Sequence, residues 1–313
     1  IALFIGLILG VAAAFAAEYF DDKVYTKDEA ERLSNGSPVL AMIPKMRNWK
    51  QRDQALLITE IDPFSPVTEA YRSLRTSLQF VRQGGASKTV LVTSASGAEG
   101  KTSTVANLAI VLATAGERVV VVGCDLRRPR IGQFLHRPEM PGFTSVLLDQ
   151  VDLQTAVVRV GNFSTLSLLA SGPIPPNPAE LLGSERAAAV FDWLALNFDV
   201  VLIDSPPLLP VADSLVLAGY SDASLLVIEA GKTKRAELKR ACELLEQVNM
   251  RPTGLVLNNL VRRSGDASEY GYAYGYSYKY RYTPEGLPQV DVNGNGHVRP
   301  AAPNQRQQRR VTP

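Results

Sequence analysis

The feature that most constrains this sequence is a glycine-containing loop between a β-branched run and an apolar helical pattern. Residues 88–94 (KTVLVTS) predict a parallel strand buried on both faces. Residues 95–102 (ASGAEGKT) follow directly, and a helical pattern runs from Lys101 to Ala115. A strand, a loop ending in Gly-Lys-Thr and a helix, in this order, form the context that a phosphate-binding P-loop requires. The sequence therefore predicts an α/β fold with a nucleotide site at this loop.

The residue types in the loop explain how it would hold a nucleotide. Glycines let backbone N–H groups turn toward phosphate oxygens, and the helix N-terminus adds positive potential. Lys101 would reach the β- and γ-phosphates, and the Thr102 hydroxyl would complete a Mg²⁺ shell. The usual first glycine is Ala95 here, and a chance glycine-rich turn is the alternative interpretation. We expect ATP and Mg²⁺ to bind at Ser96, Gly97, Ala98, Glu99, Gly100, Lys101, Thr102 and Ser103. Asn258, at the end of the last strand, is a further candidate that would contact the base; a structural cap is the alternative role for this residue.

A Mg²⁺–nucleotide site also needs carboxylates at the ends of neighbouring strands. The apolar strand 200–204 (VVLID) ends in Asp204, which has the form of a Walker B motif. A second apolar strand, 118–123, is followed by Cys124 and Asp125. A helix cap or turn role is the alternative for either carboxylate. We expect Thr102, Asp125 and Asp204 at the metal, with Lys101, Asp125 and Asp204 as catalytic residues.

The alternation of strands and helices predicts a P-loop NTPase-like, doubly wound, mostly parallel sheet with helices on both faces. Residues 38–44, bracketed by prolines, read instead as a connector with little core of its own. The further elements expected are strands at 166–170, 223–229 and 254–260, and helices at 26–33, 67–81, 178–197, 211–218 and 233–248.

The order of the P-loop, the run CDLRRP at 124–129 and the run VLIDSPP at 201–207 resembles the bacterial tyrosine kinases (BY-kinases) of capsular and exopolysaccharide synthesis. The run SGPIPPNPAELL at 171–182 is similar to a segment of that family. The resemblance covers about residues 1–282 and implies an ATP-dependent tyrosine autokinase. In the family, two aspartates precede the arginine of the second motif, whereas here Gly123 stands in the place of the first.

Residues 69–75 (EAYRSLR) place Glu69, Arg72 and Arg75 three residues apart, and therefore close together on one helical face. Taken alone, this spacing favours a solvated charged face. The resemblance implies another role, because in the family this pattern mediates subunit contacts in a ring.

Seven of the eleven tyrosines stand at alternate positions near the C-terminus. A sticky β-strand edge, weak self-association and stacking on nucleic acid are the alternatives to a phosphoacceptor cluster. An ATP site in the same chain favours phosphorylation. The expected acceptors are Tyr270, Tyr272, Tyr274, Tyr276, Tyr278, Tyr280 and Tyr282.

Residues 1–17 carry no charge and end at a charged segment, which favours a truncated transmembrane helix over a signal peptide or a buried core helix. Downstream nucleotide chemistry places the kinase domain on the cytoplasmic face of the inner membrane. Together with Asp21, Asp22 and residues 38–44, this segment resembles the C-terminal end of a Wzz-type chain-length-determinant domain. The composition, 46% hydrophobic and 20% charged, is that of a globular protein, and a net charge of +2 argues against a nucleic-acid partner.

We therefore expect a membrane helix at 1–17, a linker at 18–62, a kinase domain at 63–263, a tyrosine-rich tail at 264–282 and a disordered end at 283–313. The expected partners are other copies of the chain in a ring, the membrane, the polysaccharide polymerisation and export machinery, and a phosphatase. Two functions compete with the kinase: a nucleotide-sensing scaffold, and a ParA/MinD-type ATPase. The latter carries a lysine at the second position of the P-loop, where this chain has Ser96.

Overall fold

β-branched and leucine-rich runs form the centre of the molecule, as fully buried parallel strands. The computed structural model describes residues 4–7, 10, 21–46, 57–82, 88–137, 141–161, 163–261, 290–292 and 298–300. Within these residues, eight strands form one sheet in the order β1-β8-β7-β2-β6-β3-β5-β4. All neighbours pair in parallel except β4 and β5, which are antiparallel. The strands are β1 (Val39–Pro44), β2 (Thr89–Ser94), β3 (Val119–Gly123), β4 (Val157–Arg159), β5 (Leu166–Leu169), β6 (Val200–Asp204), β7 (Ala223–Glu229) and β8 (Gly254–Leu260).

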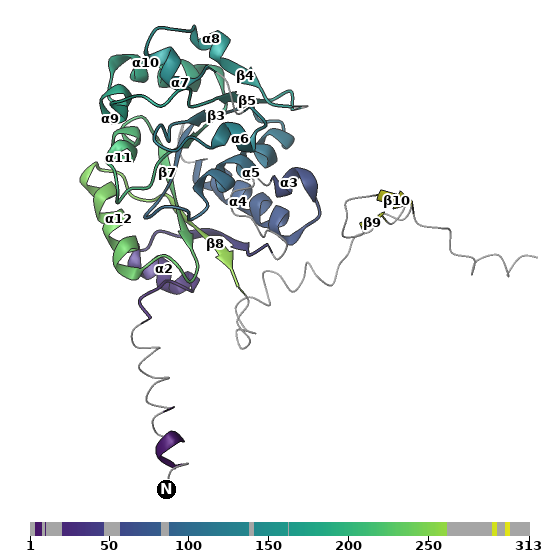
Figure 1. Cartoon of the computed structure of the whole chain (residues 1–313), viewed down its shortest axis with the longest axis vertical. Coiled ribbons are helices and arrows are strands. Elements are labelled where there is room, and N and C mark those ends of the chain that lie inside the picture. Colours follow the sequence, from purple (N-terminus) through teal and green to yellow (C-terminus); the bar gives the residue numbers. More distant parts are fainter. Residues whose placement is uncertain are drawn as a thin grey trace, which may run out of the picture. The chain divides into compact units, whose positions relative to one another are not determined.

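Helices cover both faces of this sheet (Figure 1). One face carries α3, α4, α5 and α6, and the other carries α2, α9, α10, α11 and α12. Their bounds are α2 (Lys27–Leu33), α3 (Ile58–Ile61), α4 (Pro66–Arg82), α5 (Lys101–Thr114), α6 (Ile131–Phe134), α7 (Phe143–Leu147), α8 (Leu153–Ala156), α9 (Pro178–Leu182), α10 (Glu185–Asn197), α11 (Asp213–Ala218) and α12 (Arg235–Gln247). The predicted doubly wound, mostly parallel sheet is confirmed.

The connector expected at 38–44 is wrong, because these residues form strand β1. β1 pairs in parallel with β8, and Val39 lies opposite Leu255. Ala41 and Ile43 are buried, and β1 contacts α4 through Leu40, whose carbonyl oxygen accepts a hydrogen bond from the Ser77 hydroxyl at 3.1 Å. Prolines are tolerated here because an edge strand leaves one side of its backbone without a ladder.

The single helix expected at 178–197 is divided in two. α9 ends at Leu182 with Gly183 as its C-cap, and Ser184 caps the start of α10, where its hydroxyl accepts a hydrogen bond from the Ala187 N–H at 3.2 Å. Serine is among the strongest N-capping residues, so the break is encoded locally.

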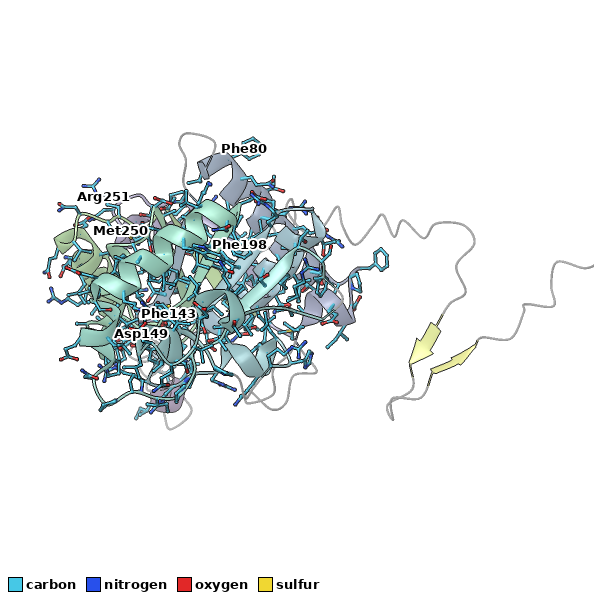
Figure 2. The ribbon with its side chains drawn as sticks, turned by 90° about the horizontal axis from the view of Figure 1, so that it is seen from above. Phe80, Phe143, Asp149, Phe198, Met250 and Arg251 are labelled. Atoms are coloured by element: carbon cyan, nitrogen blue, oxygen red, sulfur yellow. The ribbon has the colours of Figure 1, made fainter. Side chains whose placement is uncertain are left out.

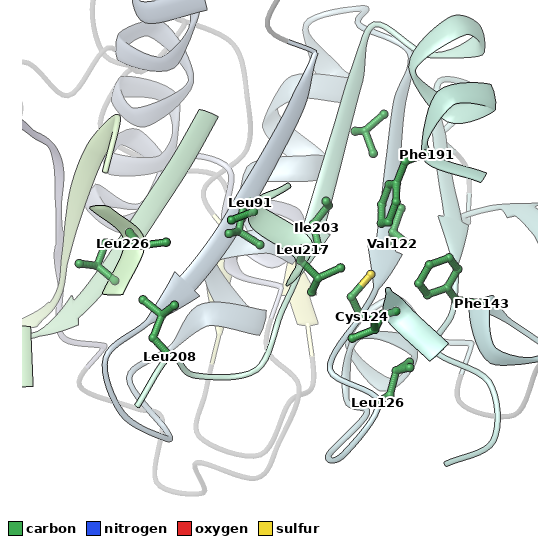
Figure 3. Packing of buried hydrophobic residues seen from close by; sticks show 14 of the residues in the cluster. Leu91, Val122, Cys124, Leu126, Phe143, Phe191, Ile203, Leu208, Leu217 and Leu226 are labelled. Carbon is green, nitrogen blue, oxygen red and sulfur yellow. The ribbon is translucent and has the colours of Figure 1, made fainter. Parts of the chain in front are cut away.

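The core between the sheet and α9–α12 is continuous and apolar. Leu91, Val122 and Ile203 from three central strands pack with Phe191 of α10 and Leu217 of α11 (Figure 3). This core fixes the carboxyl ends of β2, β3 and β6 at one edge of the sheet, where ligands of open α/β folds bind.

A second unit, residues 263–313, contains a short antiparallel pair, β9 (Val290–Val292) with β10 (Val298–Pro300). The expected tyrosine tail at 264–282 lies outside the described residues. So does most of the expected membrane helix at 1–17. Among the residues that are described, no helix is long and apolar enough to cross a membrane.

Candidate nucleotide site

The P-loop connects β2 to α5 with a backbone that only certain residues can adopt. Gly100, immediately before α5, has a φ of +96°, and Ala98 has a φ of 58°. A Cβ at Gly100 would lie 2.1 Å from the Nδ2 atom of Asn258, so glycine is required there for space as well as conformation. Left-handed residues of this kind turn successive N–H groups toward an anion. The loop therefore has the shape expected of a phosphate cradle.

Glu99 supports this loop from within. Its side chain is 1% exposed, and one carboxylate oxygen accepts the Ser96 N–H at 2.8 Å. The Thr233 hydroxyl donates to the other oxygen. Burial raises the pKa of Glu99, and the hydrogen bonds with Thr233 and Ser96 oppose that rise. Glu99 and Ser96 were predicted as nucleotide contacts, but the Glu99 side chain and the Ser96 N–H serve the loop itself.

Asn258 also supports the loop. Its Nδ2 atom donates to the carbonyl oxygen of Glu99 at 3.0 Å. This contact gives Asn258 a structural role, because its side chain holds the backbone of the P-loop at Glu99.

The residues expected at the metal converge at the sheet edge. The Thr102 hydroxyl donates to Asp204 Oδ1 at 3.1 Å, and both lie beside the largely buried Lys101. Burial raises the pKa of Asp204 to about 7; Lys101 opposes the rise, and the charge of Asp125 adds to it. Asp125 is 8% exposed and accepts the Arg128 N–H at 2.9 Å.

This donor set suits a divalent cation that is shared with phosphate. The described residues contain no cluster of three or more His, Cys, Asp or Glu side chains able to enclose a metal by themselves. Mg²⁺ rarely uses such a cage and binds through one or two carboxylates, a hydroxyl, waters and substrate phosphates. Thr102, Asp204 and Asp125 would supply the protein's share of that shell.

The structure also explains Gly123, where the family pattern has an aspartate. A Cβ at this position would lie 2.4 Å from Ser171 Oγ and 2.8 Å from both Ser171 N and Ile131 Cγ2. Ser171 Oγ is buried and makes no hydrogen bond within the described part of the chain. The space of a side chain at 123 is therefore filled by Ser171 and α6.

Cys124 and Ser205 lie near Gly123, but both side chains make other contacts and do not replace the missing carboxylate. Cys124 is fully buried beside Val122 and Leu126 in the apolar core (Figure 3), and burial raises its thiol pKa well above the ordinary value. The Ser205 hydroxyl donates to the carbonyl oxygen of Val92 at 3.0 Å. Neither side chain takes the place of the aspartate.

An ion pair fixes the loop after β3. Arg127 donates from Nε and Nη2 to the two carboxylate oxygens of Asp213 at 2.9 and 3.0 Å. Asp213 is fully buried at the start of α11. The contact raises the pKa of Arg127, so the arginine stays charged and anchors the segment that carries Asp125.

The charged pattern on α4 divides into two parts. Arg72 and Glu69 form an ion pair at 3.2 Å, with 38% of the Arg72 side chain and 50% of the Glu69 side chain exposed. Arg75 instead donates to the Val111 carbonyl oxygen of α5 at 3.3 Å, and its Nε is buried. Phe80, farther along the same helix, projects from the body of the protein and is 69% exposed (Figure 2). The outer face of α4 thus offers charge and one aromatic ring.

Comparison with known proteins places these features in one family. Residues 87–253 match the family described as "AAA domain". The chain is 38% identical over 226 residues to the tyrosine-protein kinase YwqD of Bacillus subtilis, and covers 94% of that protein and 72% of itself. The chain belongs to the bacterial tyrosine kinases. The resemblance to BY-kinases is therefore confirmed, and the fold implies that the chain binds nucleotide with a divalent metal.

Two further relatives define how far the match extends. The tyrosine-protein kinase wzc of Salmonella typhimurium is 29% identical over 284 residues, which is 86% of this chain but 39% of that protein. Among solved structures, the kinase domain of the Escherichia coli tyrosine kinase ETK matches with a TM-score of 0.71 and 29% identity. The match covers 80% of this chain and all of that domain. A structure of MinD from Pyrococcus horikoshii, at 20% identity, shares the fold alone.

Sequence reasoning assigned no role to several residues that support the site. Ser171 lies against Gly123, Asp213 binds Arg127, and the residues that follow β7 reach the P-loop. Ser171 and Thr233 could have been suspected, because both follow buried strands and strand ends in such folds meet at the site.

Proposed function

We propose that this chain transfers the γ-phosphoryl group of ATP to tyrosines of its own tail. The observation that carries the proposal is the Thr102–Asp204 contact beside Lys101 at the mouth of the P-loop. This chain, which belongs to the BY-kinase family, also carries seven closely spaced tyrosines near its C-terminus.

In the reaction, the tyrosine oxygen forms a bond to the γ-phosphorus while the bond from that phosphorus to the β–γ bridging oxygen breaks, and ADP leaves. Bound Mg²⁺ supplies charge neutralisation on the phosphates. Thr102 and Asp204 would hold the cation, and Lys101 would neutralise charge on the transferring group. Asp125, at the end of β3, would orient the phenol and accept its proton.

The tail would reach the site of a neighbouring copy. Glu69 and Arg72, on the outer face of α4, would form charge pairs across the contacts of a ring, with Arg75 supporting the helix from within. Each added phosphate brings a charge of about −1.5 to −2. A phosphorylated tail would repel itself and leave the neighbouring site, which would loosen the ring.

We place this activity at the inner membrane, with the kinase domain in the cytoplasm. Residues 1–17 would span the bilayer, 18–62 would connect, 63–263 would catalyse, and 264–282 would accept phosphate. There the ring would control the machinery that polymerises and exports polysaccharide, and a phosphatase would reset the tail. The resemblance described from the sequence supports these partners and boundaries.

Mass spectrometry tests the central claim. After incubation with ATP and Mg²⁺, phosphate should appear on Tyr270–Tyr282 in the wild type and be absent from Lys101→Met. To test transfer between chains, Lys101→Met with an intact tail is mixed with an active chain whose seven tail tyrosines are phenylalanine. Phosphotyrosine on the inactive chain supports transfer between copies; its absence in that mixture, when the wild type is labelled, contradicts it.

A second function is favoured by Gly123. With one carboxylate fewer than the family pattern, the chain could bind nucleotide and regulate polysaccharide assembly as a scaffold. That function predicts nucleotide binding by calorimetry without phosphotyrosine. ATP hydrolysis without phosphotyrosine would instead favour the ParA/MinD-type activity, which Ser96 at the second loop position disfavours.

A further inference from the structure

A lysine from outside the P-loop lies on the back of that loop. Lys232 follows β7, next to Gly231, whose φ of +72° turns the chain toward the site. The Lys232 ammonium donates to the carbonyl oxygen of Gly97 at 3.2 Å and to that of Ala98. The same ammonium contacts Glu229 Oε2 at 2.8 Å. One cation therefore binds two consecutive loop carbonyls.

In a trans peptide unit the N–H points opposite to the carbonyl oxygen, so the N–H groups of the two units that carry these carbonyls point away from Lys232. The Gly97 carbonyl shares its peptide unit with the Ala98 N–H, and the Ala98 carbonyl shares its unit with the Glu99 N–H. A cation at the oxygen of a peptide unit draws electron density toward it, which makes the N–H a stronger donor. The N–H groups of this loop are the ones that receive phosphate oxygens in a P-loop.

The lysine is held in place by a built network. Glu229 is 3% exposed and accepts Asn259 Nδ2 at 3.0 Å, and its backbone N–H donates to Thr233 Oγ1 at 3.0 Å. Thr233 in turn donates to Glu99 inside the loop. The turn after β7 thus contacts the P-loop at two adjacent residues, through a charge at 232 and a hydroxyl at 233.

We propose that Lys232 is a positioning residue that polarises the Ala98 and Glu99 peptide units and raises the affinity of the loop for polyphosphates. The proposal rests on the loop being the phosphate site of the proposed function, but not on phosphoryl transfer taking place. Because phosphate is charged in both the ground state and the transition state, the effect belongs to binding.

Calorimetric titration of the full chain with ATP·Mg²⁺ and with ADP·Mg²⁺ tests this proposal directly. Lys232→Met should weaken both affinities by about 3- to 20-fold, the fold-change that corresponds to a strengthening of roughly 10–30% in each of two hydrogen bonds to a charged group. Lys232→Arg, which keeps the cation, should recover most of the loss. Lys232→Gln provides a neutral variant that still donates a hydrogen bond, and should bind as weakly as Lys232→Met.

Lys234→Met is the matched control, because Lys234 lies two residues away and pairs at 3.6 Å with Asp22 rather than with the loop. It should bind nucleotide within twofold of the wild type. Where autophosphorylation is measurable, Lys232→Met should raise KM for ATP by the same factor and leave kcat within about threefold, the signature of uniform binding.

Equal affinity of Lys232→Met and wild type, or an Arg variant as weak as the Met variant, overturns the proposal. A chain that binds nucleotide with the expected Lys232 dependence but makes no phosphotyrosine leaves the proposal standing and rejects the kinase.

Discussion

The ends of β2 and β3, which lie on either side of β6 in the sheet, both depart from the pattern of the family, and the structure accommodates the two departures differently. The loop after β2 has Ala95 where a glycine is usual, and the end of β3 has Gly123 where an aspartate is usual. Ala95 is buried and its φ is not in the left-handed region, so a methyl group fits. Gly123 is enclosed by Ser171 and Ile131, so a larger side chain does not fit.

The difference follows from what each end contributes. The P-loop acts through backbone N–H groups, and contacts from Glu99, Asn258 and Lys232 hold that backbone in several independent ways. The end of β3 acts through a side chain, and a carboxylate that is missing there is not supplied by Cys124 or Ser205. A backbone site tolerates substitution, whereas a side-chain site loses its chemistry with the residue.

The largest effect is expected at the loop's own cation. Lys101→Met should reduce phosphotyrosine formation by about 10²- to 10³-fold or more, because charge stabilisation at the transferring group is lost. Quantitative mass spectrometry of the tail measures the loss. Lys239→Met, an exposed lysine on α12, is the control and should retain wild-type activity. Full activity in Lys101→Met would place catalysis outside the P-loop.

In the absence of a metal ion, the buried carboxylate of Asp204 should lower the stability of the folded protein. The pKa of Asp204 rises from 3.8 to about 7 in the fold, chiefly through burial. Between about pH 4 and 7, the folded protein therefore keeps a proton on Asp204 that the unfolded chain has already released. The contribution of Asp204 to the free energy of unfolding is therefore greatest below about pH 4 and falls by roughly 2–4 kcal/mol as the pH rises to about 7.

Asp204→Asn removes this dependence. In EDTA at pH 8, urea unfolding should find the variant more stable than the wild type by roughly that same 2–4 kcal/mol. Near pH 4 the two should be alike. Parallel stability curves from pH 4 to 8 would contradict the raised pKa. Mg²⁺ with nucleotide should narrow the difference in stability, because it should stabilise the wild type more than the variant.

Placing the family's aspartate at position 123, at the end of β3, should destabilise the protein without increasing its kinase activity. Gly123→Asp forces atoms into space held by Ser171 and Ile131, and we expect a loss of about 3 kcal/mol, at the upper end of overpacking in a core. Thermal unfolding measures it, and kinase activity should not rise. A double variant, Gly123→Asp with Ser171→Gly, removes the nearest contact and should recover part of the stability. A stable and more active single variant would show that this end can accept a side chain.

The sequence predicted the strands of the sheet well, because buried parallel strands require long β-branched runs such as 119–122 and 200–203. It also predicted Lys101, Thr102 and Asp204 near one another, because strand ends meet at one edge. It failed where pairing rather than pattern decides, as at β1, whose prolines at 38 and 44 suggested a connector.

Contacts between distant segments were also out of reach. Lys232 lies 135 residues from Gly97, and nothing in the local pattern of either segment indicates the other. The same holds for Ser171, whose meaning depends on the absence of a side chain at Gly123. Sequence patterns thus located Lys101, Thr102 and Asp204 at the P-loop, and missed residues such as Lys232 and Ser171 that act through another residue.

The smallest effect should come from restoring the other family residue, at the P-loop. Ala95→Gly leaves the N–H groups and their supports unchanged, so the affinity for ATP·Mg²⁺ should stay within about twofold, well inside 1 kcal/mol. Stability should fall by about 0.5–1 kcal/mol, because glycine makes the unfolded chain more flexible and the native φ does not require it. Calorimetry and urea unfolding of the same preparation separate the two quantities. A tenfold gain in affinity would mean that the alanine strains the loop, and the contrast between a tolerant β2 end and an intolerant β3 end would then be lost.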